Sequence, residues 1–180
     1  MKKIAFIISF KDFRDEEYFE TKELLENNGF EVKTFSNEKG IAIGRFGGEA
    51  IIDGTIDKID INEFNAIIFA GGSGAIDFLD NEASYRIIKE FSNKNKLIAA
   101  ICIAPVILSR AGILKGKNAT VWSSNMDKSA IKILKDNNAI FKNKFVVCDN
   151  NIITGNGPEA INEFSKAIID KLNEMDIIKQ

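Results

Sequence analysis

The stretch KLIAAICIAPVIL, residues 96–108, decides the fold of this chain. Residues 97–101 are apolar and uncharged, a pattern typical of a strand that is buried on both faces. Pro105 suits the first turn of a helix, where a missing backbone N–H costs nothing, and Gly112 suits a helix C-terminus. The stretch therefore predicts a central strand that turns sharply into a helix, with Cys102 at the turn.

The position of Cys102 is open to two interpretations. At such a turn a thiol faces the positive end of the helix dipole and unpaired backbone N–H groups, which favour the thiolate. This is the nucleophile-elbow arrangement, with cysteine where many hydrolases carry serine. Free cysteine is also among the most buried residue types and is most often an inert small hydrophobe. The stretch alone leaves a reactive and a packing thiol equally open.

The recurrence of strand and helix patterns on both sides of this stretch predicts an α/β fold. We expect strands at 3–9, 30–35, 66–70 and 97–101, and helices at 15–28, 82–93, 128–136 and 159–173. We also expect a polar loop at 10–15, an inserted hairpin at 41–56, a short strand at 120–122, and a hairpin at 145–154 that turns at 149–151. Repeated βαβ units imply a mostly parallel sheet with helices on both faces.

Composition narrows the class of protein. The 180 residues, 45% hydrophobic and 28% charged, favour one soluble globular domain spanning 1–180. A net charge of −2 and the lack of a basic run give no reason to expect nucleic acid. No uncharged apolar run reaches the ~18 residues of a membrane span. Two distant cysteines and no signal-peptide cleavage site favour the cytoplasm.

The chain contains no histidine. This absence excludes Cys–His and Ser–His catalysis as well as zinc or haem sites that depend on histidine ligands. Any proton transfer must come from a carboxylate, a thiol, tyrosine, lysine or water. We expect no metal and no cofactor.

A glycine turn, Gly-Gly-Ser-Gly at 71–74, follows the strand expected at 66–70. It does not fit a dinucleotide motif, because Asp77 stands where the third glycine would fall, and the Walker Lys-Ser/Thr pair is absent. The turn could instead aim the Gly72 N–H at a substrate oxygen, jointly with the Ile103 N–H. The structural alternative is that the glycines only permit a tight turn.

An acidic residue after the first strand is the other candidate. The loop there should lie at the same carboxyl edge of the sheet as Cys102, where open α/β folds place their sites. A carboxyl in that crevice would have a raised pKa and could donate to sulfur or act as a base. Asp15, Glu16, Glu17 and Glu20 also suit an acidic helix start, so residue chemistry alone does not select Glu17.

Three motifs together resemble one known family. AIIFAGGSGA at 66–75, AAICIAP at 99–105 and ITGNGPEAINEF at 153–164 resemble the ThiJ/PfpI superfamily, also called the DJ-one family. The opening EEYFETKELLENNGFEV at 16–32 fits the first βαβ unit of that family, so the resemblance covers nearly the whole chain. It implies a flavodoxin-like three-layer sandwich, Cys at a strand-to-helix elbow, and a homodimer.

The resemblance assigns roles residue by residue. The reactive cysteine falls on Cys102, its acidic partner on Glu17, and the backbone donors on Gly72 and Ile103. The expected pocket residues are Gly71, Tyr18, Trp122 and Asn156. Cys148 is interpreted as a packing residue of the 145–154 hairpin.

Departures from the family pattern favour its stress-protein branch. Ile103 stands where protease-like members carry histidine, so peptidase activity is not expected. Trp122 occupies a segment from which a histidine often approaches the cysteine, and Asn156 stands where arginine is common. These differences weaken the inference that this chain has the glyoxalase and deglycase activities of the family, because those activities rely on proton movement near the thiol.

The first hypothesis is a redox-responsive stress-protective protein, in which peroxide oxidises a low-pKa Cys102 and Glu17 hydrogen-bonds the product. The alternative is a glyoxalase- or deglycase-like enzyme that acts on methylglyoxal-type aldehydes through the Cys102 thiolate. A small-molecule hydrolase or hydratase, or a binding protein with an inherited thiol, also remains open. The expected partners are a second copy of the chain and a small aldehyde or other small molecule.

Overall fold

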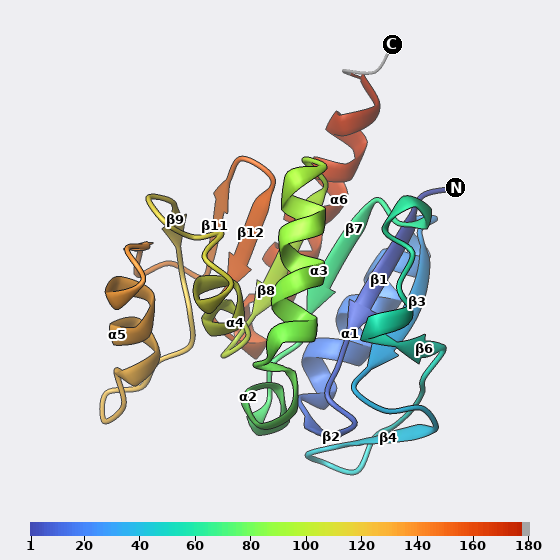
Figure 1. Cartoon of the computed structure of the whole chain (residues 1–180), viewed down its shortest axis with the longest axis horizontal. Helices are drawn as coiled ribbons and strands as arrows, with labels where there is room; N and C mark the ends of the chain where they lie inside the picture. The colour runs from blue at the N-terminus through green and yellow to red at the C-terminus, as the bar shows by residue number, and fades with distance from the viewer. Residues whose placement is uncertain (178–180) are drawn as a thin grey trace.

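A seven-stranded sheet forms the centre of the computed structural model, which describes residues 1–177 (Figure 1). In spatial order its strands are β11 (Val146–Asp149), β12 (Ile152–Gly155), β8 (Leu97–Ile101), β7 (Ala66–Phe69), β1 (Lys3–Ile7), β3 (Glu31–Ser36) and β6 (Gly54–Thr55). Among the described strand pairs of this sheet, only β11–β12 is antiparallel. The mostly parallel sheet expected from the sequence is therefore confirmed.

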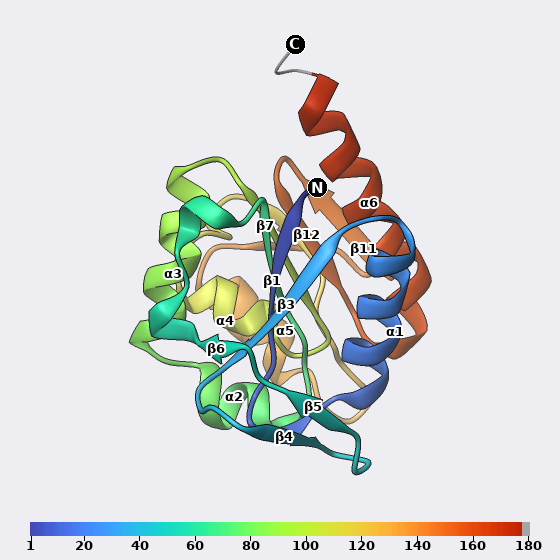
Figure 2. The same ribbon diagram turned by 90° about the vertical axis from the view of Figure 1, so that its right-hand side faces the viewer.

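Helices cover both faces of this sheet (Figure 2). One face packs against α1 (Asp15–Asn27) and α6 (Ile161–Ile177). The other packs against α2 (Ser73–Leu79), α3 (Glu82–Asn93), α4 (Pro105–Arg110) and α5 (Ser129–Asp136). Short 3-10 turns lie at Ile56–Lys58, Ile61–Glu63 and Pro158–Ala160. No helix in the described part of the chain is long and apolar enough to cross a bilayer.

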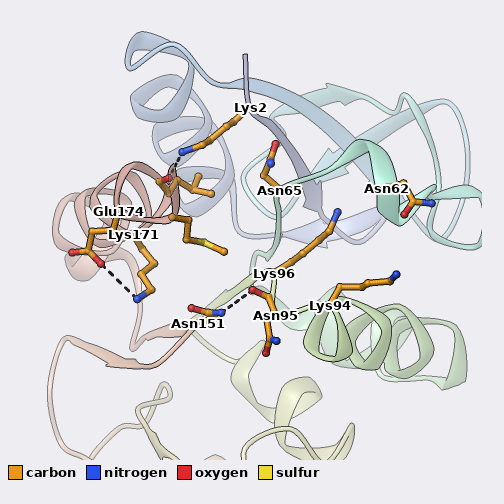
Figure 3. Close-up of a pocket in the computed structure, with 11 residues that line it drawn as sticks. Lys2, Asn62, Asn65, Lys94, Asn95, Lys96, Asn151, Lys171 and Glu174 are labelled. Carbon is orange, nitrogen blue, oxygen red and sulfur yellow. Dashed lines mark hydrogen bonds and ion pairs between the residues drawn. The ribbon is translucent and has the colours of Figure 1, made fainter. Parts of the chain in front are cut away.

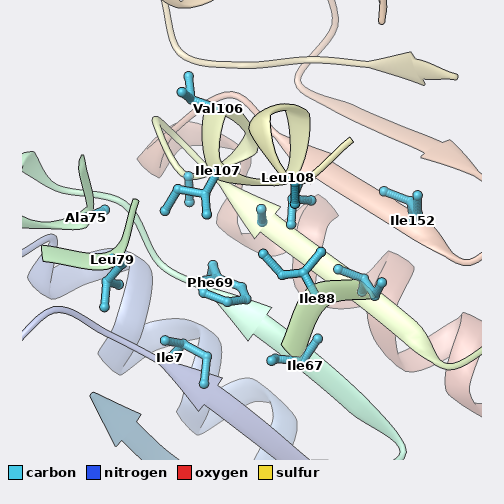
Figure 4. Packing of buried hydrophobic residues seen from close by; sticks show 14 of the residues in the cluster. Ile7, Ile67, Phe69, Ala75, Leu79, Ile88, Val106, Ile107, Leu108 and Ile152 are labelled. Carbon is cyan, nitrogen blue, oxygen red and sulfur yellow. The ribbon is translucent and has the colours of Figure 1, made fainter. Parts of the chain in front are cut away.

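The central strand β8 explains why the sheet needs cover on both sides. All five of its residues are buried. Because side chains alternate along a strand, Ile98 and Ala100 join the core beneath α3 and α4, whereas Ala99 and Ile101 join the core beneath α1 and α6. Figure 4 shows the first of these cores, where Phe69 of β7 lies among side chains of α3 and α4. The uncharged run at residues 97–101 thus contributes side chains to both hydrophobic cores.

A second, small sheet is built from β2 (Lys11–Phe13), β4 (Ile41–Gly44) and β5 (Glu49–Ile51). The antiparallel β4–β5 pair confirms the expected inserted hairpin. The polar loop expected at 10–15 is wrong in part, because β2 pairs in parallel with β4. Three residues are too few for a strand pattern to show in the sequence, so only the tertiary pairing reveals β2.

The strand expected at 120–122 is also wrong. The strand there is β9 (Asn118–Ala119), which pairs in parallel with β10 (Ile140–Phe141). Beyond it, Thr120 donates its N–H to Thr154 Oγ1 at 2.9 Å, so a side chain replaces the ladder partner. The remaining expected helices and strands are present, with ends shifted by a few residues.

Candidate functional site

Cys102 lies at a strained turn between the central strand and α4. Its φ of +64° is in the left-handed region, which is uncommon for residues other than glycine. Its N–H donates to the Gly155 carbonyl at 2.9 Å, and its carbonyl accepts the Trp122 N–H at 2.8 Å. Two neighbouring segments therefore hold the backbone of this residue in place, and its side chain remains partly exposed.

Gly71 allows a carboxyl to approach the thiol. A Cβ at this position would lie 2.6 Å from Cys102 Cβ and 2.8 Å from Glu17 Oε2, so no side chain fits. The Gly71 N–H instead donates to Glu17 Oε2 at 2.8 Å. The end of β7 thus binds a carboxylate that reaches across from the first turn of α1.

Glu17 is a fully buried carboxyl whose hydrogen bonding is incomplete. Its exposed fraction is 0%, and within residues 1–177 its Oε1 has no hydrogen-bond partner. Burial raises the pKa of this carboxyl from 4.5 to about 7, although the Gly71 N–H, the Cys102 thiol and the Arg14 guanidinium act in the opposite direction. A proton is therefore available at this site near neutral pH.

The environment of the Cys102 thiol corrects the expectation of a low-pKa thiolate. Burial raises the pKa of the thiol, and the neighbouring Glu17 carboxylate raises it further. The backbone N–H groups of Gly72 and Ile103 lower it, as expected, but they do not prevail. Because the negative charge of each group disfavours that of the other, the Cys102–Glu17 pair retains a proton at neutral pH.

A solvent-accessible cavity of about 210 Å³ opens beside the sulfur. It is lined by Arg14, Arg45, Gly72, Ser73, Cys102, Ile103 and Trp122. The two N–H groups that act on the sulfur, those of Gly72 and Ile103, belong to this lining. The arrangement can therefore stabilise negative charge on sulfur or on an atom bound to it.

Most of the site residues expected from the sequence come together here. The structure places six of them in one cluster, which are Glu17, Gly71, Gly72, Cys102, Ile103 and Trp122. Cys148 lies apart from them and is exposed on β11, so its interpretation as a packing residue is wrong.

Two expected pocket residues are not among those that line the cavity. Tyr18 is buried, bonds through its hydroxyl to Thr34 Oγ1 at 2.7 Å, and packs its ring edge-on against Phe6. Asn156 follows β12, and its backbone N–H donates to the Phe145 carbonyl at 2.9 Å. The Tyr18 hydroxyl is therefore committed to Thr34 rather than to the place of the missing histidine beside the thiol.

Arg14, Arg45 and Ser73 line the cavity but are absent from the sequence-based set. Arg45 lies in the turn between β4 and β5, and its N–H donates to the Phe13 carbonyl at 2.9 Å. The glycine-flanked sequence at 44–48 marked a hairpin, but its place over Cys102 depends on the pairing of β2 with β4. Local sequence patterns carry no signal for that pairing.

Residues 1–177 contain no group of three or more histidine, cysteine, aspartate or glutamate side chains that could hold a metal ion.

A larger cavity, of about 470 Å³, lies at the opposite edge of the sheet (Figure 3). Two of its lysines are engaged in structural contacts: Lys96 donates to the carbonyls of Ile61 and Phe64, and Lys171 pairs with Glu174 at 3.5 Å. The Lys96 contacts tie the start of β8 to the segment before β7, and the Lys171 pair lies within α6. The thiol and its carboxyl partner lie at the other edge, where the carboxyl ends of parallel strands meet.

Comparison with known families identifies the fold family. The model of the DJ-1/PfpI family matches residues 2–171. This chain belongs to the DJ-1/PfpI family. Peptidase, stress-protein and deglycase names all occur in this family, so membership alone does not select one activity.

Three relatives show the extent of the similarity. A protein of Methanocaldococcus jannaschii described as uncharacterized is 40% identical over 176 residues, which are 96% of this chain and 84% of that protein. Deglycase PfpI of Pyrococcus furiosus is 34% identical over 120 residues, 67% of this chain and 72% of that protein. General stress protein 18 of Bacillus subtilis is 28% identical over 177 residues, 94% of this chain and 99% of that protein.

A solved structure agrees with the fold of this DJ-1/PfpI member. The crystal structure of a ThiJ/PfpI domain protein from Brachyspira murdochii superposes with a TM-score of 0.90. It is 34% identical, and the match covers 96% of each chain. The α/β architecture is therefore that of the DJ-1/PfpI family.

Proposed function

We propose that this protein is a redox-responsive stress-protective protein whose reactive group is the Cys102 thiol. The observation that carries the proposal is the buried Glu17 carboxyl, with a pKa of about 7, beside that thiol. A relative named as a general stress protein, 28% identical over nearly its whole length, supports the same reading.

The chemistry needs one proton acceptor and one hydrogen-bond donor at the same place. The thiol loses its proton to Glu17, the thiolate attacks a peroxide oxygen, and the S–O bond forms as the O–O bond breaks. The leaving oxygen takes the proton of the attacked hydroperoxide oxygen and departs as water or an alcohol, which leaves a sulfenate on Cys102 and the thiol proton on Glu17. A second peroxide converts the sulfenate to a sulfinate. Protonated Glu17 can then donate to a sulfinate oxygen through Oε1, the atom that lacks a partner.

The test compares the two cysteines of one chain. Reduced protein is treated with a slight excess of peroxide, and both cysteine-containing peptides are analysed by mass spectrometry. We expect two oxygen atoms to add selectively at Cys102, and less sulfinate in Glu17→Ala than in Glu17→Gln, which keeps an N–H donor. Equal and slow oxidation of Cys102 and Cys148 would contradict the proposal.

A second candidate function is a glyoxalase- or deglycase-like activity. The observation that favours it is the open cavity beside the sulfur, whose lining includes Gly72 and Ile103. The Cys102 thiolate would add to an aldehyde carbon, forming an S–C bond while the carbonyl oxygen takes the proton from Glu17. The product is a hemithioacetal. The relative named Deglycase PfpI is consistent with this carbonyl chemistry.

Turnover of methylglyoxal tests this candidate. We expect loss of the aldehyde with wild-type protein, none above background with Cys102→Ser, and a severe reduction with Glu17→Gln. Wild-type protein that consumes no more aldehyde than Cys102→Ser would exclude the activity.

A further inference from the structure

A turn that the proposed chemistry does not use is held over the cavity by a buried carboxylate. Asp15 accepts the N–H of Phe46 at 2.9 Å and the N–H of Gly48 at 2.7 Å. A Cβ on Gly44 or on Gly48 would lie 2.5 Å from this carboxyl group, so the turn can close on Asp15 only with glycine there. The backbone of Arg45 is thereby fixed at the edge of the cavity.

Arg45 contributes an unneutralised positive charge to this cavity. In the described part of the chain its guanidinium forms no ion pair, whereas Arg14 pairs with Glu16 at 3.0 Å. Phe46 also covers Arg14, whose guanidinium carbon lies 5.0 Å from the ring centroid. Within residues 1–177 the cavity lining includes no carboxylate. A negatively charged molecule is therefore favoured at the mouth of the site.

The volume and the lining of the site limit which anion fits. The cavity of about 210 Å³ has the Cys102 sulfur with the Gly72 and Ile103 N–H groups in its lining, and Arg45 also in its lining. A guanidinium matches the planar geometry of a carboxylate with two parallel N–H donors. A short molecule with a carbonyl at one end and a carboxylate at the other satisfies both groups at once.

We propose that the carbonyl substrate of Cys102 is a small aldehyde that carries a carboxylate, and that Arg45 binds this carboxylate. The inference deepens the second candidate function and rests on it. The sulfur adds to the aldehyde carbon, the carbonyl electron pair moves to oxygen, and that oxygen takes the Glu17 proton. The carboxylate takes no part in bond making and remains paired with Arg45.

Two alkylating reagents measure the preference of the Cys102 site for an anion independently of any catalytic turnover. Iodoacetate and iodoacetamide both form an S–C bond with loss of iodide, but only iodoacetate is anionic. The ratio of their rate constants at Cys102 cancels any change in the pKa of the thiol. We expect Arg45→Gln to lower the iodoacetate-to-iodoacetamide ratio about threefold, the size typical of one exposed ion pair. Arg45→Lys keeps the charge but not the two parallel donors, so it should keep only part of the preference.

Matched controls separate a local effect from a change in net charge. Arg86→Gln removes the same charge from α3, outside the cavity lining, and should leave the ratio at Cys102 unchanged. The ratio at Cys148 in the same chain should be unaffected by either variant. Raising the salt concentration should reduce the preference in wild-type protein and have little effect in Arg45→Gln.

Protection by two aldehydes then tests the substrate itself. Glyoxylate and glyoxal differ in one terminal group, and we expect glyoxylate to protect Cys102 from iodoacetamide at lower concentration in wild-type protein but not in Arg45→Gln. An alkylation ratio that does not change in Arg45→Gln, or that falls equally in Arg86→Gln, overturns the inference. If the ratio depends on Arg45 but no aldehyde is turned over, the glyoxalase-like activity fails while the carboxylate site stands.

Discussion

The two cysteines of this chain differ in their surroundings more than in the direction of their pKa shifts. Burial raises the pKa of both thiols, although Cys148 is an exposed residue that its neighbours cover only in part. At Cys148 the charges that act on the thiol are those of Lys171, Glu163 and Glu174 on α6. At Cys102 a buried carboxyl contacts the thiol, and two N–H groups face the sulfur. Reactivity here is expected to come from a paired proton acceptor rather than from a resting thiolate.

The largest expected effect comes from replacing each cysteine by serine in turn, because the two variants should differ strongly in sulfinate formation and aldehyde turnover. Cys102→Ser should reduce peroxide-dependent sulfinate formation and aldehyde turnover at least about a hundredfold, because the nucleophile is lost. Cys148→Ser should leave both unchanged. Mass spectrometry and turnover assays on the two variants measure this. A similar loss in both would mean that the two thiols do not differ in function.

The pH dependence of stability should report the buried carboxyl next to Cys102. Because the folded state raises the pKa of Glu17 from 4.5 to about 7, the native protein binds more protons than the unfolded chain between these values. The free energy of unfolding should therefore fall by about 3 kcal/mol as the pH rises through this window. Glu17→Gln should remove that fall, so that the variant is more stable than wild type at pH 8.

Urea unfolding at several pH values, in wild type and in Glu17→Gln, measures this effect. Parallel pH profiles for the two proteins would show that folding does not raise the pKa of Glu17. The proposed difference between Cys102 and Cys148 would then have no support from this carboxyl.

Adding one methyl group at Gly71 should separate the thiol from its carboxyl. The new Cβ would lie 2.6 Å from Cys102 Cβ and displace the backbone or the thiol. We expect Gly71→Ala to lower the free energy of unfolding by about 1–3 kcal/mol and to make the oxidation rate of Cys102 approach that of Cys148. Thermal unfolding and peptide mapping measure the two effects.

Gly112→Ala provides a matched control, because its φ of +85° is strained but nothing lies within 4 Å of the added Cβ. That variant should lose stability without a change in the reactivity of Cys102. If it slows Cys102 as much as Gly71→Ala does, general destabilisation explains both.

The smallest expected effect tests the position of Tyr18. Its hydroxyl bonds to Thr34 in the core beneath α1, away from the cavity. Tyr18→Phe should cost about 1 kcal/mol of stability, since Thr34 loses a partner, and leave the oxidation of Cys102 unchanged. Denaturant unfolding and the peroxide assay measure this. Slower oxidation of Cys102 would instead place the hydroxyl in the proton pathway.

Local sequence patterns correctly predict the helices and strands whose structure is determined by residues adjacent in the sequence. The uncharged run at 97–101 and Pro105 correctly predict β8, its burial on both faces, and the helix that follows. The predicted strand at 120–122 fails because the Thr154 hydroxyl, from a segment distant in sequence, takes the bond that a strand would offer. Such a side-chain partner leaves no periodic trace.

The site residues also divide into those that local sequence predicts and those that only tertiary contacts determine. The turn residues Cys102, Gly72 and Ile103 follow from the order of strand, glycine turn and helix. Glu17 could be selected from four acidic neighbours only by family resemblance, because its burial depends on how α1 docks against β7. Arg45 was missed because three residues of β2 bring its turn to the cavity.

The hydrogen bond from the Gly71 N–H to Glu17 makes one backbone amide a spectroscopic reporter of the site. Its proton and nitrogen chemical shifts should follow the charge on the carboxyl through a midpoint near pH 7. The chain has no histidine, so no imidazole titrates in that range to obscure the signal. Reaction of the Cys102 thiol with peroxide or aldehyde would shift the pH of this midpoint. The modification could therefore be followed without substituting any residue.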